Sequence, residues 1–304
     1  MLYIAFDACY AHPLPERHRF PMIKYELLPK QLLYEGTCTP EQFFSPKPID
    51  KDTALRVHTA AYYEQLCALT LSKSEVRGLG FPLSEALVHR EHVIAQGTID
   101  GTEHALTHGI AMNIAGGTHH AYADRSEAFC MLNDQAIAAQ WLLDNGKANK
   151  VLILDLDVHQ GNGTAAIFSN QKDVFTFSMH GEKNYPFRKE TSDWDIGLAD
   201  QTDDATYLNI LADALVDLHQ KVQPDFVFYL CGVDVIAQDK LGRLGLSVAG
   251  CKERDEMVLQ WCRRHALPVQ CSMGGGYVPD LSVLVEAHAN TCLLYTSPSP
   301  RDRG

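Results

Sequence analysis

The sequence predicts a single-domain α/β protein, in which a mostly parallel, multi-stranded sheet is covered by helices on both faces. Short apolar runs alternate with amphipathic helical patterns along the chain. The runs at 151–154 and 226–230 are continuously hydrophobic, as in parallel strands that are buried on both faces. With 304 residues, of which 46% are hydrophobic, the chain is long enough to bury one large core.

The first element is a strand-like segment at 1–6, and an apolar stretch at 111–115 precedes a Gly-Gly turn. Further strands are expected at 151–154, 174–178, 226–230 and 268–273. Helices are expected at 22–34, 59–71, 84–96, 134–144, 206–222, 250–265 and 279–290. The helix at 206–222 has one apolar stripe that should face the core, formed by Tyr207, Ile210, Leu211, Ala214, Leu215 and Leu218.

Asp155, Asp157 and His159 follow the apolar run at 151–154 at spacing i, i+2, i+4. On an extended chain their side chains would point to one side, at the strand end where α/β sheets place ligands. Two carboxylates and an imidazole suit zinc or ferrous iron. Taken alone, the same residues also occur as turn and cap residues.

Asp234 is the candidate for a further ligand, because it lies just past the end of the apolar run at 226–230. In isolation such an aspartate is more often a loop carboxylate or a helix cap than a ligand. His119 and His120 follow a Gly-Gly turn and could move protons, since imidazole titrates near neutral pH. Tyr277 follows three glycines and could donate its hydroxyl hydrogen to an oxyanion.

Five segments together resemble the zinc-dependent histone deacetylase superfamily, which shares an α/β fold with arginase. The resembling segments are Gly117-Thr118-His119-His120-Ala121, Phe129-Cys130-Met131-Leu132-Asn133-Asp134, Asp155-Leu156-Asp157-Val158-His159-Gln160-Gly161-Asn162-Gly163-Thr164, Cys231-Gly232-Val233-Asp234 and Gly274-Gly275-Gly276-Tyr277. The similarity runs from about Ala5 to about Thr291. Details of these segments look most like the class IV branch and its bacterial relatives.

The resemblance implies a role for each matching residue. Asp157, His159 and Asp234 would bind the metal, His119 and His120 would handle protons, and Tyr277 would polarise the acyl carbonyl. Asp155 would orient His119 and help to hold a structural potassium ion near Ser178 and Met179. The acyl-lysine tunnel would be formed by Gly117, Ala128, Phe129, Tyr185 and Gly275.

Two residues depart from the family pattern. Ala128 stands where the family usually has glycine, so a methyl group is expected near the tunnel. Asn162 replaces the aspartate that backs the second histidine in class I relatives. An amide offers His120 a hydrogen bond without negative charge, so Asn162→Asp should raise the basicity of His120.

The expected activity is metal-dependent removal of an acyl group from N-acyl-lysine, with the metal acidifying a water and polarising the carbonyl. Hydrolysis of acetylpolyamines or another small amide uses the same chemistry and stays open as an alternative. An arginase-like hydrolase would need a second metal with additional ligands. A non-catalytic acyl-lysine reader would be expected to lose Tyr277 or a ligand.

The formal net charge of −12 argues against a nucleic-acid partner and mildly favours cationic ones such as lysine-rich tails or polyamines. No stretch approaches the roughly 20 apolar residues of a membrane span. Nine cysteines without a CxxC pair, and no signal-peptide pattern, predict a reducing cytoplasm. The catalytic domain should span 1–291, and residues 292–304 resemble a translated sequencing-adapter read-through. Oligomeric state cannot be predicted from these features.

Overall fold

The computed structural model describes residues 2–296, in which eight parallel strands form one sheet in the order β2-β1-β3-β8-β7-β4-β5-β6. The strands are β1 (Tyr3–Ala5), β2 (Phe43–Phe44), β3 (Ile110–Asn113), β4 (Val151–Asp155), β5 (Val174–Gly181), β6 (Trp194–Leu198), β7 (Phe226–Leu230) and β8 (Val269–Ser272). The parallel sheet confirms the predicted fold class. β4, β7 and β8 are completely buried, and the continuous apolar runs of β4 and β7 are typical of such strands.

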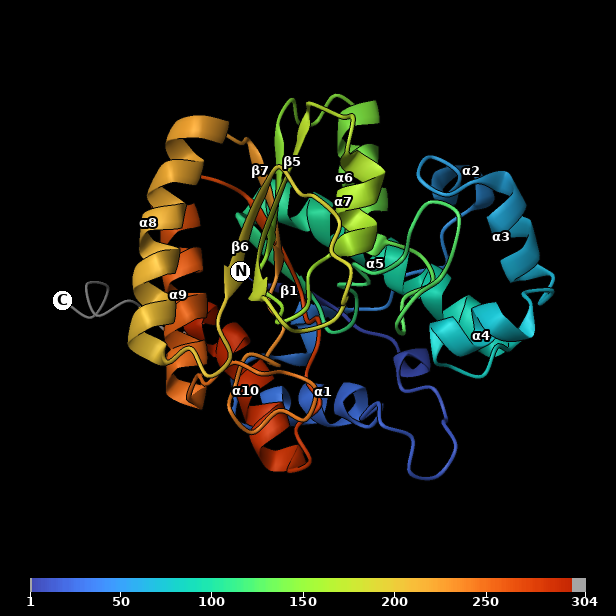
Figure 1. Ribbon diagram of the computed structural model, residues 1–304, viewed down its shortest axis with the longest axis horizontal. Helices are drawn as coiled ribbons and strands as arrows, with labels where there is room; N and C mark the ends of the chain where they lie inside the picture. The colour runs from blue at the N-terminus through green and yellow to red at the C-terminus, as the bar shows by residue number, and fades with distance from the viewer. Residues whose placement is uncertain (1, 297–304) are drawn as a thin grey trace.

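Helices cover both faces of the sheet (Figure 1). They are α1 (Lys24–Tyr34), α2 (Lys51–Ala54), α3 (Ala60–Cys67), α4 (Lys73–Leu79), α5 (Glu85–His108), α6 (Asp134–Asp144), α7 (Asn162–Phe168), α8 (Asp204–Val222), α9 (Val248–Arg264) and α10 (Leu281–Thr296), with short 3-10 helices at Ala8–Tyr10 and Pro40–Gln42. Figure 1 shows α8 and α9 on one side of the sheet and α5, α6 and α7 on the other. None of the helices within 2–296 has the length and apolar character of a membrane span.

Several helix starts follow directly from local capping chemistry. Asn133 accepts a hydrogen bond from Ala136 N, so α6 begins at the predicted residue, Asp134. Asp203 caps α8 and Ser247 caps α9 in the same way, and both helices begin two residues before the predicted starts. Local signals thus define these boundaries to within about one turn.

The expected helix at 84–96 was too short, because α5 continues to His108. Glycine lowers helix propensity, and Gly97 and Gly101 lie just past the predicted end. Close packing explains why residue 97 is a glycine, because a Cβ at this position would lie only 2.6 Å from the hydroxyl of Tyr10. Gly109, with φ of 88°, then ends α5 in the left-handed conformation.

The last helix also extends beyond its prediction. α10 continues through Thr296, and the Cys292 side chain is buried with its sulfur 3.0 Å from that of Met112. The remainder of the predicted tail, 297–304, lies outside the described residues. The assignment of 292–304 as a non-native tail stays a prediction.

The strand order brings the candidate site together. Four of the five motif segments follow β3, β4, β7 and β8, which lie next to one another in the sheet as β3-β8-β7-β4. Because all four strands are parallel, their carboxyl ends meet at one edge of the sheet, where ligands bind in open α/β folds.

Candidate active site

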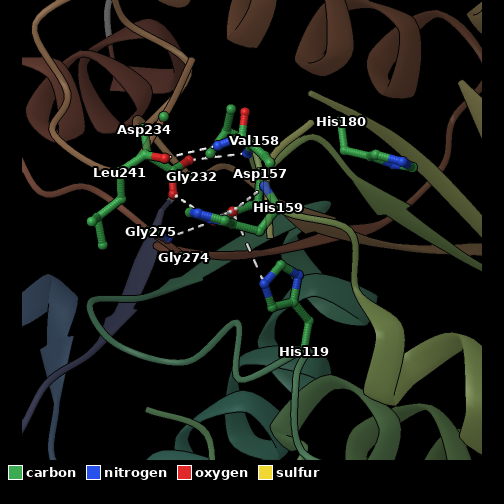
Figure 2. A network of polar contacts seen from close by, with 12 residues as sticks. His119, Asp157, Val158, His159, His180, Gly232, Asp234, Leu241, Gly274 and Gly275 are labelled. Atoms are coloured by element: carbon green, nitrogen blue, oxygen red, sulfur yellow. Dashed lines mark hydrogen bonds and ion pairs between the residues drawn. The ribbon is translucent and has the colours of Figure 1, made fainter. Parts of the chain in front are cut away.

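Asp157, His159 and Asp234 form a buried group at the carboxyl ends of β4 and β7. His159 Nδ1 lies 3.0 Å from Asp157 Oδ1 and 3.1 Å from Asp234 Oδ2. One ligand atom from each residue lies within 4.8 Å of the others, which is close enough to share one metal ion. Figure 2 shows the three side chains turned toward one another, with His119 approaching from the side of Asp157.

The extended backbone expected for 155–159 is wrong. β4 ends at Asp155, and the chain bends over residues 157–159. Asp155 Oδ1 accepts from Asp157 N at 3.1 Å, and Asp157 Oδ1 accepts from His159 N at 2.9 Å. These local side-chain-to-backbone hydrogen bonds take the place of the backbone hydrogen bonds that a continued strand would make. As a result the Asp155 side chain contacts His119, and of this segment only Asp157 and His159 belong to the metal group.

A buried arginine holds the two ligand-bearing loops together. Arg254 in α9 donates to Gly232 O at 2.6 Å and to Leu156 O at 3.2 Å, and it pairs with Asp255 at 2.7 Å. Its side chain is completely buried, so these bonds are made away from water. Arg254 therefore ties the loop after β4 to the loop after β7.

The donor set fits a divalent cation. Asp234 is fully buried, and its Oδ2 has no hydrogen-bond partner among the described residues even though His159 Nδ1 lies nearby. Burial, together with the negative charge of Asp157, raises the pKa of Asp234 to about 7. Gly275 leaves the necessary space, since a Cβ there would lie 2.0 Å from Asp234 Oδ2 and 2.7 Å from Asp157 Oδ2. Two buried carboxylates around an open space require a positive charge for their stability, and a bound cation would supply it.

The two histidines have different partners and different proton affinities. His119 Nδ1 contacts Asp155 Oδ2 at 2.7 Å, whereas His120 Nδ1 contacts Asn162 Oδ1 at 2.6 Å. Burial would lower the pKa of His119, but the Asp155 carboxylate outweighs it and the pKa rises. The pKa of His120 falls well below its usual value, first because of burial and then because of positive charge on the neighbouring His119.

Tyr277 approaches the group from the loop after β8. Its ring centroid is 6.3 Å from that of His159, and its backbone N donates to Asp239 Oδ2 at 2.6 Å. Burial and the nearby Asp234 and Asp157 carboxylates raise the pKa of Tyr277 well above its usual value. The phenol therefore stays protonated, and it can act as a hydrogen-bond donor.

Asp157 and His159 line a small cavity, and four of the five predicted tunnel residues line it as well: Gly117, Ala128, Phe129 and Gly275. Tyr185 is not in its lining. Tyr185 instead packs its ring at 5.1 Å from that of His120 and donates its hydroxyl hydrogen to Glu127.

The turn that carries Ala128 and Phe129 is strained. Glu127 and Cys130 exchange backbone hydrogen bonds of 3.0 and 2.9 Å around it, and φ is 44° at Ala128 and 69° at Phe129. Positive φ at both central positions is typical of a type I′ turn, which favours Asn and Gly. The methyl group expected at Ala128 does line the cavity, and it comes with backbone strain that the sequence alone did not reveal.

Sequence reasoning missed several residues at the site. Lys24 is completely buried, donates to Gly274 O at 3.2 Å and lies 5.8 Å from the ring centroid of Tyr277. Burial lowers its pKa to about 8, against the opposing pull of the site carboxylates. Asp239 anchors the Tyr277 backbone, and Glu127 contacts Asn162. Glu127 and Asp239 lie near matched motifs in the sequence, and this proximity could have marked them as candidate site residues. Lys24 lies far from every matched motif, so the sequence held no indication of its place at the site.

Comparisons with known proteins identify the family of this chain. The family model described as "Histone deacetylase domain" matches residues 16–292. An uncharacterized protein of Picosynechococcus sp. is 44% identical, covering 94% of this chain and 95% of its own length. Histone deacetylase clr6 of Schizosaccharomyces pombe is 31% identical over 88% of this chain and 68% of that protein.

A solved structure described as an HDAC homolog complexed with SAHA superimposes with a TM-score of 0.84 at 22% identity, covering 98% of this chain and 85% of that one. At 22% identity, the similarity to this structure supports the fold alone. The class IV branch stays a prediction. With the family model matching most of its length, the chain belongs to the histone deacetylase family and carries a deacetylase domain.

Proposed function

We propose that this protein is a metal-dependent amide hydrolase that removes an acyl group from N-acyl-lysine. One observation carries the proposal: Asp157 and His159 of the buried Asp157–His159–Asp234 group line a small cavity that His119, His120 and Tyr277 also line. A metal site, a proton acceptor and a hydrogen-bond donor thus converge on one point, as amide hydrolysis requires.

Zinc is the metal we propose, with ferrous iron as the alternative. Two carboxylates and one imidazole leave coordination positions open, which is typical of catalytic rather than structural zinc sites. Zinc held there would supply Lewis-acid polarisation of the acyl carbonyl and would lower the pKa of a coordinated water. A structural potassium ion near Asp155, Ser178 and Met179 remains an expectation from the family resemblance.

His120 is the proposed proton acceptor. Its Nδ1 is engaged by Asn162 Oδ1, which directs Nε2 toward the cavity as a free acceptor. The lowered pKa of His120 keeps the ring neutral near pH 7, as a base must be at the start of the reaction. His119, whose pKa is raised beside Asp155, would carry positive charge and favour negative charge developing in the cavity.

Tyr277 would hold the oxyanion. When the acyl carbonyl is attacked, its oxygen gains negative charge, and the protonated phenol can donate a hydrogen bond to it. Asp239 fixes the Tyr277 backbone, and Lys24 fixes Gly274 in the preceding glycine segment. The positions of these partners support a preorganised donor.

The experiment that tests the proposal is a screen of the zinc-reconstituted protein against acetyl-lysine peptides, longer acyl-lysines and acetylated polyamines. Turnover of acyl-lysine, lost together with bound zinc in Asp157→Ala and Asp234→Ala, is the expected result. Turnover of acetylpolyamines alone would replace the proposed substrate class with the alternative one. Full zinc occupancy in both variants by elemental analysis would contradict the ligand assignment.

A further inference from the structure

Glu127 lies beside the candidate site without touching the metal group. It begins the strained turn that presents Phe129 to the cavity, and its side chain is 22% exposed. One carboxylate oxygen, Oε1, accepts a hydrogen bond from Asn162 Nδ2 at 2.9 Å and another from the hydroxyl of Tyr185. The other oxygen, Oε2, lies 3.7 Å from Arg125 Nε. Nothing in the motifs assigns a role to this residue.

Asn162 connects Glu127 to His120. Its Oδ1 is 2.6 Å from His120 Nδ1, and its Nδ2 also donates to the hydroxyl of Tyr122 at 3.0 Å. A primary amide has nearly the same shape in either orientation, so the contact with His120 does not by itself decide whether oxygen or nitrogen faces the ring. A second partner must make that choice.

Glu127 makes that choice more strictly than the Tyr122 hydroxyl, because an ionised carboxylate can only accept hydrogen bonds whereas a hydroxyl can also donate. It selects the orientation in which the amide NH₂ group points outward and the amide oxygen faces His120. That oxygen in turn can only accept, so His120 must carry its hydrogen on Nδ1. The Nε2 atom is then left with a lone pair that can take a proton.

We infer that Glu127 is a positioning residue for the hydrolysis, acting through Asn162 to hold His120 in the tautomer that has a free Nε2. The inference rests on the proposed function of His120 as proton acceptor. Class I relatives are expected to carry a negatively charged aspartate at the position of Asn162, in direct contact with the second histidine. In this protein the negative charge belongs to Glu127, which is separated from His120 by the amide of Asn162. The Tyr185 hydroxyl, bound to the same oxygen, helps to fix the carboxylate in place.

This arrangement changes the outcome expected for Asn162→Asp. The sequence alone suggested that an aspartate would simply strengthen the base. In the structure one oxygen of the new carboxylate would lie about where Nδ2 now sits, 2.9 Å from Glu127 Oε1, and two like charges would face each other without a hydrogen between them. Asn162→Asp should therefore impair the enzyme unless Glu127 is also neutralised.

A set of four variants tests the inference in the zinc-loaded protein: Glu127→Gln, Asn162→Asp, the double variant, and Glu190→Gln as a matched control. Glu190 is an exposed carboxylate that accepts from the Tyr122 hydroxyl at 3.1 Å and has no hydrogen bond with Asn162 among the described residues. Steady-state kinetics on an acetyl-lysine peptide, zinc content and melting temperature would be measured for each.

Glu127→Gln should lower kcat about tenfold or more with little change in KM, because outer partners of working imidazoles typically contribute about 10–100-fold. Asn162→Asp should also lose kcat. The double variant should recover above both single variants, since the glutamine amide introduced at position 127 can donate to the carboxylate introduced at position 162. Glu190→Gln should resemble the wild type. A double variant no better than Asn162→Asp would overturn the inference.

Nitrogen-15 NMR of the histidine rings, with His120 assigned by comparison with His120→Ala, gives a readout that does not need a substrate. The wild type should show a protonated Nδ1 and a free Nε2 at His120, and Glu127→Gln should show a mixture of tautomers. An unchanged tautomer in Glu127→Gln would overturn the positioning role. If no acyl-lysine is turned over, the proposed function fails while this readout still tests the inference.

Discussion

Gly275→Ala should abolish metal binding by filling the space that the ion needs. A Cβ at this position would lie 2.0 Å from Asp234 Oδ2 and 2.7 Å from Asp157 Oδ2, whereas ordinary van der Waals contact begins at 3.4 Å. The backbone φ of Gly275 is not in the left-handed region, so alanine adds no backbone strain there. The substitution therefore acts on the two carboxylates rather than on the fold.

The size of the effect follows from these distances. To accommodate the methyl group, the Asp234 oxygen would have to move by roughly 1 Å or more, while metal–ligand distances tolerate only about 0.2 Å. Changing an outer partner of a metal ligand already costs about 10–100-fold in affinity. Direct displacement of a ligand atom should cost at least about 100-fold, or ~2.8 kcal/mol.

The assay is a zinc titration against a competing chelator, with elemental analysis of the dialysed protein. Gly78→Ala is the matched control, because Gly78 lies in α4 and a Cβ there meets nothing within 4 Å. That control should bind zinc normally and gain up to about 1 kcal/mol from better helix propensity. Zinc affinity of Gly275→Ala within about threefold of the wild type would refute the placement of the ion between these carboxylates.

Three further predictions test the site and its support. Tyr277→Phe should lower kcat by about 100–1,000-fold with zinc content intact, because one oxyanion donor is lost; near-normal kcat on every active substrate would exclude the role. Arg254→Met should cost about 3–5 kcal/mol in urea unfolding, since Asp255 is left as an unpaired buried charge, and a cost below about 1 kcal/mol would contradict the account of the loops. Ala128→Gly should add about 0.5–1 kcal/mol by relieving the left-handed backbone, and a melting temperature below that of the wild type would refute the strain argument.

Much of the fold could be predicted because its determinants are local. Continuous apolar runs marked β4 and β7, and an asparagine side chain fixed the first residue of α6. The candidate ligands could be predicted because Asp157, His159 and Asp234 each follow a buried strand, and parallel strands end at the same edge of a sheet. Short elements such as α2, α4 and β2 were not predicted, since they hold too few residues to show a hydrophobic period.

Prediction from local residue patterns failed where side-chain hydrogen bonds or surrounding residues determine the backbone geometry. The sequence placed Asp155 on one face with Asp157 and His159, but carboxylates that bond to nearby backbone N–H groups bend the chain after β4. In the same way, the sequence identified an alanine at position 128 without showing that its φ would be positive. Such conformations are imposed by the surroundings and not by residue preference.

The sequence by itself determined which residue types stand at the ends of four buried strands, and hence the chemistry that the protein can perform. Only the tertiary structure decided that those strands are neighbours, that Lys24 reaches Gly274 across 250 positions, and that Glu127 faces the amide of Asn162. The physical reason is that strand order and long-range contacts minimise the free energy of the whole core. No local pattern of residues encodes that minimum.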